Sequence, residues 1–312
     1  DDLLAYAYKG LIKKTGLDPS MLTEVFSGCG NQGGEDNRDV ARMAALLSGM
    51  PKEGPGVTIN RNCSSALDAV NIAAKTIACG EGDFTIGSGV ESMSRAPWSF
   101  LKPERVPTTK PPKIWDTTVG WRFNNPALDA LYPIISLGEG AEVIAEEMQI
   151  SREEQDAFAL ESHRRAIDAI NFGKFEKEIC AIPVKQRRGD AVLVDIDEHP
   201  RYNKTEKGFE LAIDMAGLAK LPAAFKKDGT VTAGNSSGIN DGAAAVALIL
   251  LFHIVLRPSV LTVSVVAPGG ASPSLISFEV HLTSSIPFAV DEYVPTTVPL
   301  SSSTVYLIPP ML

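Results

Sequence analysis

The residues best suited to chemistry in this 312-residue chain are Cys63 and the two serines that follow it, Ser64 and Ser65. A thiolate is a strong nucleophile. A cysteine at the N-terminus of a helix lies beside free N–H groups and the positive end of the helix dipole, which favours the thiolate. Backbone amides in such a turn can also bind an oxyanion. The simpler interpretation is that Cys63 is a small buried hydrophobic residue, as many free cysteines are.

The segment around Cys63 predicts a strand, a turn and a helix in that order. Val57 to Asn60 reads as a short strand. A helix follows because apolar residues recur at three- and four-residue spacing, namely Ala66, Leu67, Ala69, Val70, Ala73, Ala74 and Ile77. Ser64 and Ser65 suit its first turn, where side-chain oxygens accept free amide protons. Nucleophiles of several enzymes occupy such a turn.

A second motif, Gly28-Cys-Gly-Asn-Gln-Gly33, matches the G-x-G-x-x-G pattern of dinucleotide-binding loops. It lies between a predicted strand at 23–26 and a predicted helix at 36–47. Glu35 and Asp36 argue against a pyrophosphate there, because they would put two carboxylates where the phosphates bind. We interpret the loop as a tight structural turn, and a dinucleotide-dependent oxidoreductase stays as an alternative function.

The cysteines and histidines predict no metal site and no disulfide framework. The four cysteines are Cys29, Cys63, Cys79 and Cys180, and the four histidines are His163, His199, His253 and His281. They show neither the paired spacing of zinc ligands nor a disulfide pattern. We interpret His163 as a surface residue on a helix and His199 as a structural or rim residue in a loop. A reducing compartment suits a thiol enzyme.

Charge and hydropathy exclude other classes of protein. The formal net charge of -9 argues against a nucleic-acid or anionic-membrane binder. The uncharged run Ala243–Leu256 is too short to span a bilayer and suits a buried strand. No signal peptide is recognisable, and we expect a cytoplasmic protein. The chain begins at Asp1 rather than Met, so we expect its native N-terminus to be missing, which leaves an organellar location open.

The remaining elements predict an α/β fold. Asp1 to Gly16 reads as an amphipathic helix that stops at the glycine, and 83–87 as a buried strand after the Cys63 helix. Strand–helix–strand order with short apolar strands implies a mainly parallel sheet. From Trp98 the character changes, and the proline-rich stretch Lys102–Lys113 predicts an irregular excursion. Ser151 with Glu154 forms a capping box that starts a helix.

Four stretches resemble the active-site motifs of the thiolases, the acetyl-CoA acetyltransferases and 3-ketoacyl-CoA thiolases. They are Gly56–Val70, Gly89–Pro97, Ser151–Leu160 and Gly229–Ala245. The resemblance runs in register from Asp1 to Leu250. It implies a layered α/β/α half formed by 1–97 plus 231–250, and a mostly helical loop domain at 98–230 that covers the acyl-CoA site. Residues 251–312 form an atypical tail.

The resemblance implies an acyltransferase that moves acetyl or acyl groups between CoA thioesters through a Cys63 acyl-enzyme. It places Leu137, Gly138, Ala233 and Ser237 near the pantetheine arm. CoA thioester is the substrate, and no further cofactor is implied. Family members are usually dimers or tetramers. In this family the glycines of the Gly28 loop have a packing role. Asn240 and Asp241 we expect to hold their own turn by local hydrogen bonds.

The resemblance ends at about Leu250. Thiolases continue with an Asn in an NEAF motif, a His in a GHP motif and a second Cys in a CxGGG-type motif, and none occurs in residues 251–312. Pro222 also stands where many members have a nucleotide-contacting Arg. We read the tail as a foreign, frameshifted or ill-ordered sequence. We therefore expect impaired activity, and the alternative is a non-catalytic remnant that binds acyl-CoA or a partner subunit.

Overall fold

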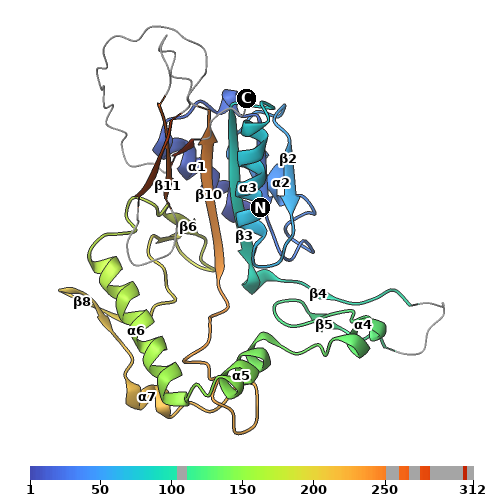
Figure 1. The fold of residues 1–312 in the computed structure, drawn as a ribbon, viewed down its shortest axis with the longest axis vertical. Coiled ribbons are helices and arrows are strands. Elements are labelled where there is room, and N and C mark those ends of the chain that lie inside the picture. The colour runs from blue at the N-terminus through green and yellow to red at the C-terminus, as the bar shows by residue number, and fades with distance from the viewer. Residues whose placement is uncertain (104–110, 251–259, 267–274, 282–304, 308–312) are drawn as a thin grey trace. The chain divides into compact units, whose positions relative to one another are not determined.

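The computed structural model describes residues 1–103, 111–250, 260–266, 275–281 and 305–307 of the chain (Figure 1). These residues divide into two units, one formed by 1–91 with 242–312 and the other by 92–241. The boundaries expected from the sequence, after residues 97 and 230, fall inside the second unit as it is divided here. They stay a prediction.

The first unit is built on a five-stranded sheet with the strand order β13-β10-β3-β1-β2. Its strands are β1 (Glu24–Gly28), β2 (Gly56–Ile59), β3 (Phe84–Ser92), β10 (Asp241–Ile249) and β13 (Val305–Leu307). β1 runs parallel to both β2 and β3, with Gly28 opposite Ile59 and Gly89. The mainly parallel α/β sheet expected from the sequence is confirmed for these strands.

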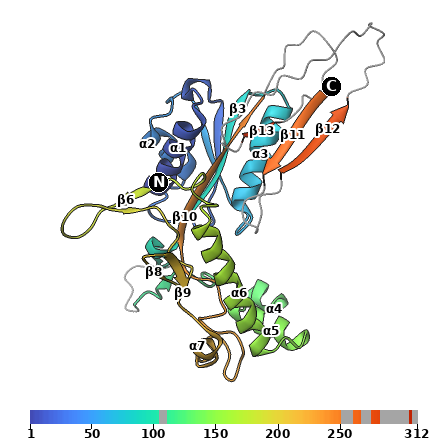
Figure 2. The same ribbon diagram turned by 90° about the vertical axis from the view of Figure 1, so that its left-hand side faces the viewer.

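Helices cover both faces of this sheet. α1 (Asp2–Thr15) and α2 (Val40–Ser48) pack on one face around Val25 and Ile86, and α3 (Ser65–Ala78) packs on the other around Phe26 and Leu248 (Figure 2). Val25 and Phe26 are neighbours on β1 but belong to different hydrophobic clusters, because successive side chains of a strand point to opposite faces of the sheet. The layered α/β/α half expected from the sequence is confirmed.

The ends of the helices follow their capping residues. α1 ends at Gly16, whose φ of +68° is the left-handed conformation that glycine adopts without strain. α2 begins later than the predicted residue 36, because Asn37 and Arg38 have positive φ values of 59° and 70°. The side chain of Asp39 then accepts a hydrogen bond from the amide of Arg42, so the helix starts at Val40.

Glycines bring α3 unusually close to the sheet. A Cβ atom built on Gly28 would lie 2.2 Å from the backbone nitrogen of Ala66, and one on Gly89 would lie 2.4 Å from the Cβ of Ala66. A Cβ on Gly87 would lie 2.7 Å from the Cα of Val70. These residues leave no room for any side chain, and so the first two turns of α3 rest directly on β1 and β3.

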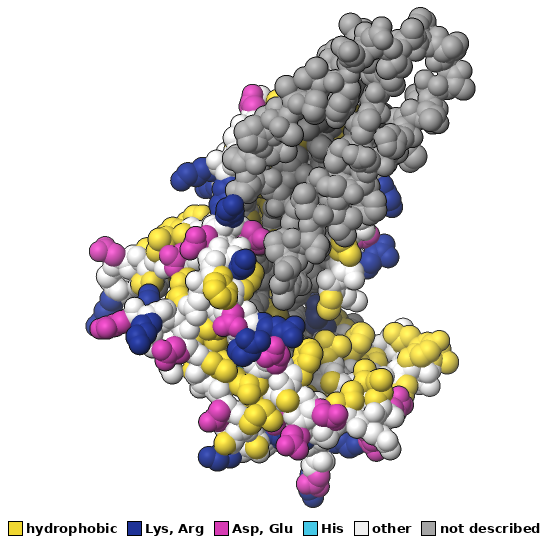
Figure 3. Space-filling view, turned by 60° about the vertical axis from the view of Figure 1, so that its left-hand side comes forward, with side chains coloured by type: hydrophobic (Ala, Val, Ile, Leu, Met, Phe, Trp, Pro, Cys, Tyr) yellow, Lys and Arg dark blue, Asp and Glu magenta, His cyan; other side chains and the backbone are white. Residues whose placement is uncertain are grey.

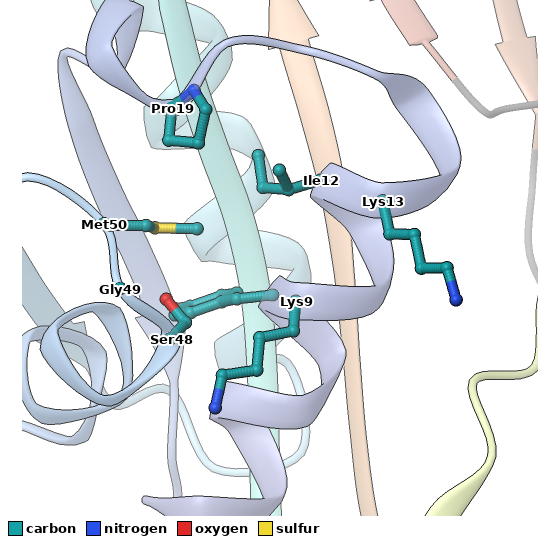
Figure 4. A pocket seen from close by; sticks show the side chains of 8 residues that line it. Lys9, Ile12, Lys13, Pro19, Ser48, Gly49 and Met50 are labelled. Atoms are coloured by element: carbon teal, nitrogen blue, oxygen red, sulfur yellow. The ribbon is translucent and has the colours of Figure 1, made fainter.

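One buried polar chain crosses the core of the first unit. The hydroxyl of Tyr8 donates to the Oγ of Ser88 at 2.8 Å, and Ser88 donates to the carbonyl of Phe26 at 2.9 Å. Burial raises the pKa of Tyr8 to about 12. A small cavity of about 200 Å³ opens beside this tyrosine, between α1 and the end of α2. Figure 4 shows its lining, with the amino groups of Lys9 and Lys13 directed away from Met50.

Among its described residues, the second unit contains four α-helices, the short 3-10 helix Met93–Arg95 and three two-stranded antiparallel ladders. The α-helices are α4 (Pro126–Leu131), α5 (Leu137–Glu147), α6 (Arg152–Asn171) and α7 (Met215–Ala219). The ladders pair β4 (Trp98–Ser99) with β5 (Trp115–Asp116), β6 (Ile182–Val184) with β7 (Val192–Val194), and β8 (Tyr202–Thr205) with β9 (Gly208–Leu211). The predicted capping box of Ser151 and Glu154 is present at the start of α6.

The surface of the second unit carries large apolar side chains among its charges. Leu137, Phe158 and Trp98 are 89%, 79% and 73% exposed. Figure 3 shows hydrophobic side chains lying among acidic and basic ones on the face that it draws. The expected excursion Lys102–Lys113 lies mostly outside the described residues.

Little of the tail is described. The backbones of β11 (Val260–Val266) and β12 (Leu275–His281) form an antiparallel pair, and β13 lies parallel to β10. The interpretation of 251–312 as foreign, frameshifted or ill-ordered sequence concerns residues that mostly lie outside the described part, so it stays a hypothesis.

Candidate active site

Cys63 lies where the sequence predicts it, in the turn between β2 and α3. β2 ends at Ile59, and α3 begins at Ser65 with Ser64 as its N-cap. The thiol is free and exposed, so Cys63 is not the buried hydrophobic residue of the simpler interpretation. Asn62, directly before it, has a φ of +50°, a left-handed conformation that asparagine tolerates better than most residues. The turn is therefore sharp and presents the sulfur outward.

Hydrogen bonds inside the turn hold its backbone. The amides of Ser64 and Ser65 donate to the carbonyls of Arg61 and Asn62 at 3.2 and 3.0 Å. The Oγ of Ser65 accepts from the amide of Arg61 at 2.8 Å, whereas Ser64 makes no side-chain capping bond. The expected oxyanion donors are therefore not the amides of Ser64 and Ser65, since both already donate within the turn.

Two backbone amides of the glycine-rich loop bind the carboxylate of Glu91. The amides of Gly30 and Asn31 donate to the two oxygens of Glu91 at 2.8 and 3.2 Å. A dinucleotide phosphate would have to displace this carboxylate, which weighs further against the oxidoreductase alternative. Cys29 in the same loop is buried. Burial, followed by the nearby charges of Glu91 and Asp36, raises the pKa of its thiol to about 12.

The turn that carries Ala233 and Ser237 is built by buried charged groups of the second unit. Asn235 accepts from the amide of Thr232 at 2.7 Å and donates to Asp156 on α6 at 2.9 Å. Asp156 also pairs with Arg152 at 2.8 Å, and its side chain is only 2% exposed. Arg152 in turn donates to the carbonyl of Leu218. The shape of this turn thus depends on α6 rather than on its own residues alone.

The start of α5 carries Leu137 and Gly138 and is joined to the same turn. Leu137 is exposed, and a Cβ on Gly138 would lie 2.2 Å from the ring of Phe225, so the glycine backbone rests on that ring. One turn further along the helix, the buried carboxylate of Glu142 accepts the amides of Thr230 and Val231 at 2.9 and 2.8 Å. Glu142 therefore ties the helix to the segment that leads into Ala233.

Glu142 is expected to make this part of the molecule sensitive to pH. Burial raises the pKa of its carboxyl, but the amides of Thr230 and Val231 outweigh burial and bring the pKa below its usual 4.5. A carboxyl with a lowered folded-state pKa stabilises the fold fully above its unfolded pKa, and this contribution is lost as the pH falls through the folded value. Urea unfolding should show that Glu142→Gln destabilises the protein strongly near neutral pH and progressively less as the pH falls below 4.5. A loss that does not change with pH would contradict this account.

The structure changes the interpretation of Asp241 and gives detail to that of His163. Asp241 was expected to stabilise its own turn, but its carboxylate accepts the amide of Ser94, 147 positions earlier, at 2.9 Å. His163 is half-buried on α6, and its Nδ1 accepts the amide of Arg201 at 3.3 Å. The centroid of its ring lies 5.6 Å from that of His199, and the two rings are tilted by 37°. Burial lowers the pKa of His163, with His199 and Arg201 acting in the same direction.

Several residues that build the site escaped sequence reasoning. Glu91, Glu142 and Asp156 are acids without a distinctive local motif. Asp156 has one usable signal, because Arg152 precedes it by four positions on the same helix. The candidate residues themselves fall into both units, with Cys63 in the first and Leu137, Gly138, Ala233 and Ser237 in the second.

Among the described residues, no group of three or more His, Cys, Asp and Glu side chains is arranged to hold a metal ion. In the same part of the chain no helix combines the length and the apolarity needed to cross a bilayer.

Comparison with known proteins gives a consistent result. Residues 1–250 match the family model for the thiolase N-terminal domain. The chain is 43% identical over 284 residues to the β-ketoadipyl-CoA thiolase of Acinetobacter baylyi, covering 89% of this chain and 68% of that protein. It is 47% identical to the corresponding protein of Pseudomonas aeruginosa, covering 80% and 59%.

Solved structures agree with the sequence matches. The crystal structure of the Bacillus anthracis acetyl-CoA acetyltransferase superposes with a TM-score of 0.66 at 36% identity, over 79% of this chain and 57% of that one. Human mitochondrial 3-ketoacyl-CoA thiolase gives the same TM-score at 33% identity, over 79% and 58%. The chain thus spans 57–68% of the length of these four proteins.

Proposed function

The chain belongs to the thiolase family, and we propose that it accepts acyl groups from CoA thioesters on Cys63. The observation that carries this proposal is the exposed thiol in a sharp turn at the N-terminus of α3. The relatives are named as thiolases and acetyl-CoA acetyltransferases, which supports acyl transfer as the reaction class.

The proposed chemistry is a double displacement. In the cleavage direction the Cys63 sulfur attacks the 3-keto carbon of a 3-ketoacyl-CoA, the C2–C3 bond breaks, and C2 takes a proton to give acetyl-CoA. In the condensation direction the sulfur attacks the thioester carbon of acetyl-CoA, and CoA leaves as a thiol after taking up a proton. Both directions pass through a Cys63 thioester, whose acyl group then goes to the sulfur of CoA or to the α-carbon of a second acetyl-CoA. The accepting atom loses a proton, and the Cys63 sulfur leaves and is protonated again.

Four residues of the second unit are proposed to contact the pantetheine arm: Leu137, Gly138, Ala233 and Ser237. Leu137 is 89% exposed and presents an apolar side chain suited to a flexible, mostly uncharged ligand. Gly138 and Ala233 are small, which lets a ligand approach the backbone closely. The network of Glu142 and Asp156 fixes the elements that carry these residues.

We expect this chain to acylate Cys63 but to complete the full reaction cycle only slowly. The GHP and CxGGG-type motifs that supply general acid–base groups in the family do not occur in its sequence. Loss of such groups typically lowers rates by about 10²–10⁴-fold. A non-catalytic thiolase that only binds acyl-CoA or a partner subunit is the second candidate. We further propose a homo-oligomer and a cytoplasmic location, which sedimentation and cell fractionation would test.

Intact-mass spectrometry after incubation with acetyl-CoA tests the proposal. One acetyl group should appear on the protein, map to Cys63 and disappear in Cys63→Ala. Cys79→Ala is the matched control, because Cys79 is the other exposed cysteine among the described residues and lies at the far end of α3. Absence of an adduct in a folded chain that still binds CoA would favour the non-catalytic candidate.

A further inference from the structure

A continuous set of hydrogen bonds leads from the end of β3 to the residue before Cys63. It begins at Glu91, whose carboxylate accepts the amides of Gly30 and Asn31 at 2.8 and 3.2 Å. The Cα of Gly30 also lies close to this carboxylate, since a Cβ there would be 3.0 Å from a Glu91 oxygen. Glu91 therefore fixes the backbone of the glycine-rich loop in one position.

Asn60 connects that loop to the nucleophile turn. Its Nδ2 donates to the carbonyl of Gly30 at 2.8 Å, and its Oδ1 accepts the amide of Asn62 at 2.9 Å. Both ends of one side-chain amide are used, each on a different segment. An asparagine oxygen that binds the amide two residues on forms a local turn, and here it holds Asn62 at its positive φ of 50°.

The far side of Cys63 is fixed as well. The carbonyl of Asn62 accepts the amide of Ser65 at 3.0 Å, and Ser65 is the first residue of α3. Gly28 and Gly89 allow this end of the helix to rest on the sheet. Cys63 thus stands between anchored neighbours while its own side chain remains exposed.

We infer that Asn60 and Glu91 are positioning residues for the Cys63 thiol. This inference rests on the proposed function, since it concerns the thiol that takes the acyl group. Asn60 sets the angle at which the turn presents the sulfur, and Glu91 holds the loop to which Asn60 is attached. Attack on a thioester requires a defined approach, and a misplacement of about 1 Å can cost about 10²-fold in rate. Alkylation by a small reagent has no such requirement.

The test compares two reactions of the same thiol in the full chain. One is acetyl transfer from acetyl-CoA to Cys63, and the other is alkylation of Cys63 by iodoacetamide, both followed by mass spectrometry. Asn60→Ala should slow acetyl transfer by about 30- to 100-fold and alkylation by less than about 3-fold. Asn60→Asp keeps the acceptor for Asn62 but loses the donor to Gly30, so it should lie between. Glu91→Ala should resemble Asn60→Ala, and Glu91→Gln, which keeps an acceptor, should recover part of the rate.

Asn71→Ala is the matched control, because Asn71 is an exposed asparagine on α3 and should leave both rates unchanged. Hydrogen exchange of the peptide containing Asn62 and Cys63 is measured alongside, and it should speed up in Asn60→Ala but not in Asn71→Ala. Unchanged exchange, or equal loss of both reactions, would overturn the inference. Failure of the wild-type chain to acetylate would overturn the proposed function instead, and the exchange rates would still decide whether Asn60 fixes the turn.

Discussion

Replacing Gly28 with alanine is expected to lower the free energy of unfolding by about 3 kcal/mol, at the upper end of the cost of overpacking. The new Cβ would lie 2.2 Å from the backbone of Ser65 and Ala66. Backbone atoms cannot rotate away as a flexible side chain can, so α3 must move off β1. The same movement displaces the turn of Cys63, and acetylation should fall together with stability. Urea unfolding followed by circular dichroism measures the first effect, and mass spectrometry measures the second.

Gly242→Ala is the control for this prediction. Gly242 lies in β10, its φ is outside the left-handed region, and a Cβ there would meet no atom within 4 Å. The Gly242→Ala variant should have the same unfolding curve and the same acetylation rate as the wild-type chain. If Gly28→Ala were as stable as Gly242→Ala, then α3 would not rest on β1 as closely as described.

Replacing Asp156 with alanine is expected to cost about 3 kcal/mol, the lower end of the cost of breaking a buried ion pair by removing one partner. Asp156 is almost fully buried, and its loss leaves the guanidinium of Arg152 and the side chain of Asn235 without their carboxylate. Arg152 keeps its bond to the carbonyl of Leu218, which is why the lower figure is expected. Urea unfolding should show the loss. Affinity for CoA, measured by calorimetry, should fall because Asn235 shapes the proposed pantetheine turn.

Asp168 offers a control on the same helix. Arg164 and Asp168 form the same kind of pair at four-residue spacing, but their side chains are 51% and 46% exposed. Solvent screens such a pair, so Asp168→Ala should be indistinguishable from the wild type in stability and in CoA affinity. Equal effects at Asp156 and Asp168 would mean that burial of the ion pair does not matter in this unit.

Local sequence signals were sufficient for much of the fold. The apolar spacing after Ser65 gives α3 because a helix buries one stripe, and Gly16 stops α1 because it alone enters the left-handed region freely. Ser151 and Glu154 mark the start of α6 because both bonds of a capping box lie within four residues. Signals of this kind also placed Cys63 between a strand and a helix. They failed at α2, where the left-handed Asn37 and Arg38 delay the start of the helix.

The sequence by itself therefore determined where α1, α3 and α6 form and which residue is the nucleophile candidate, because those properties depend on neighbours in the chain. The tertiary structure decided which groups hold that candidate and its surroundings. Glu91 binds Gly30 across 61 positions, Glu142 binds Thr230 across 88, and Asp241 binds Ser94 across 147. The residues next to a single Asp or Glu in the sequence do not indicate which distant amide its carboxylate will bind. Each pairing arises only when the folded chain brings the acid to amides that would otherwise lack an acceptor.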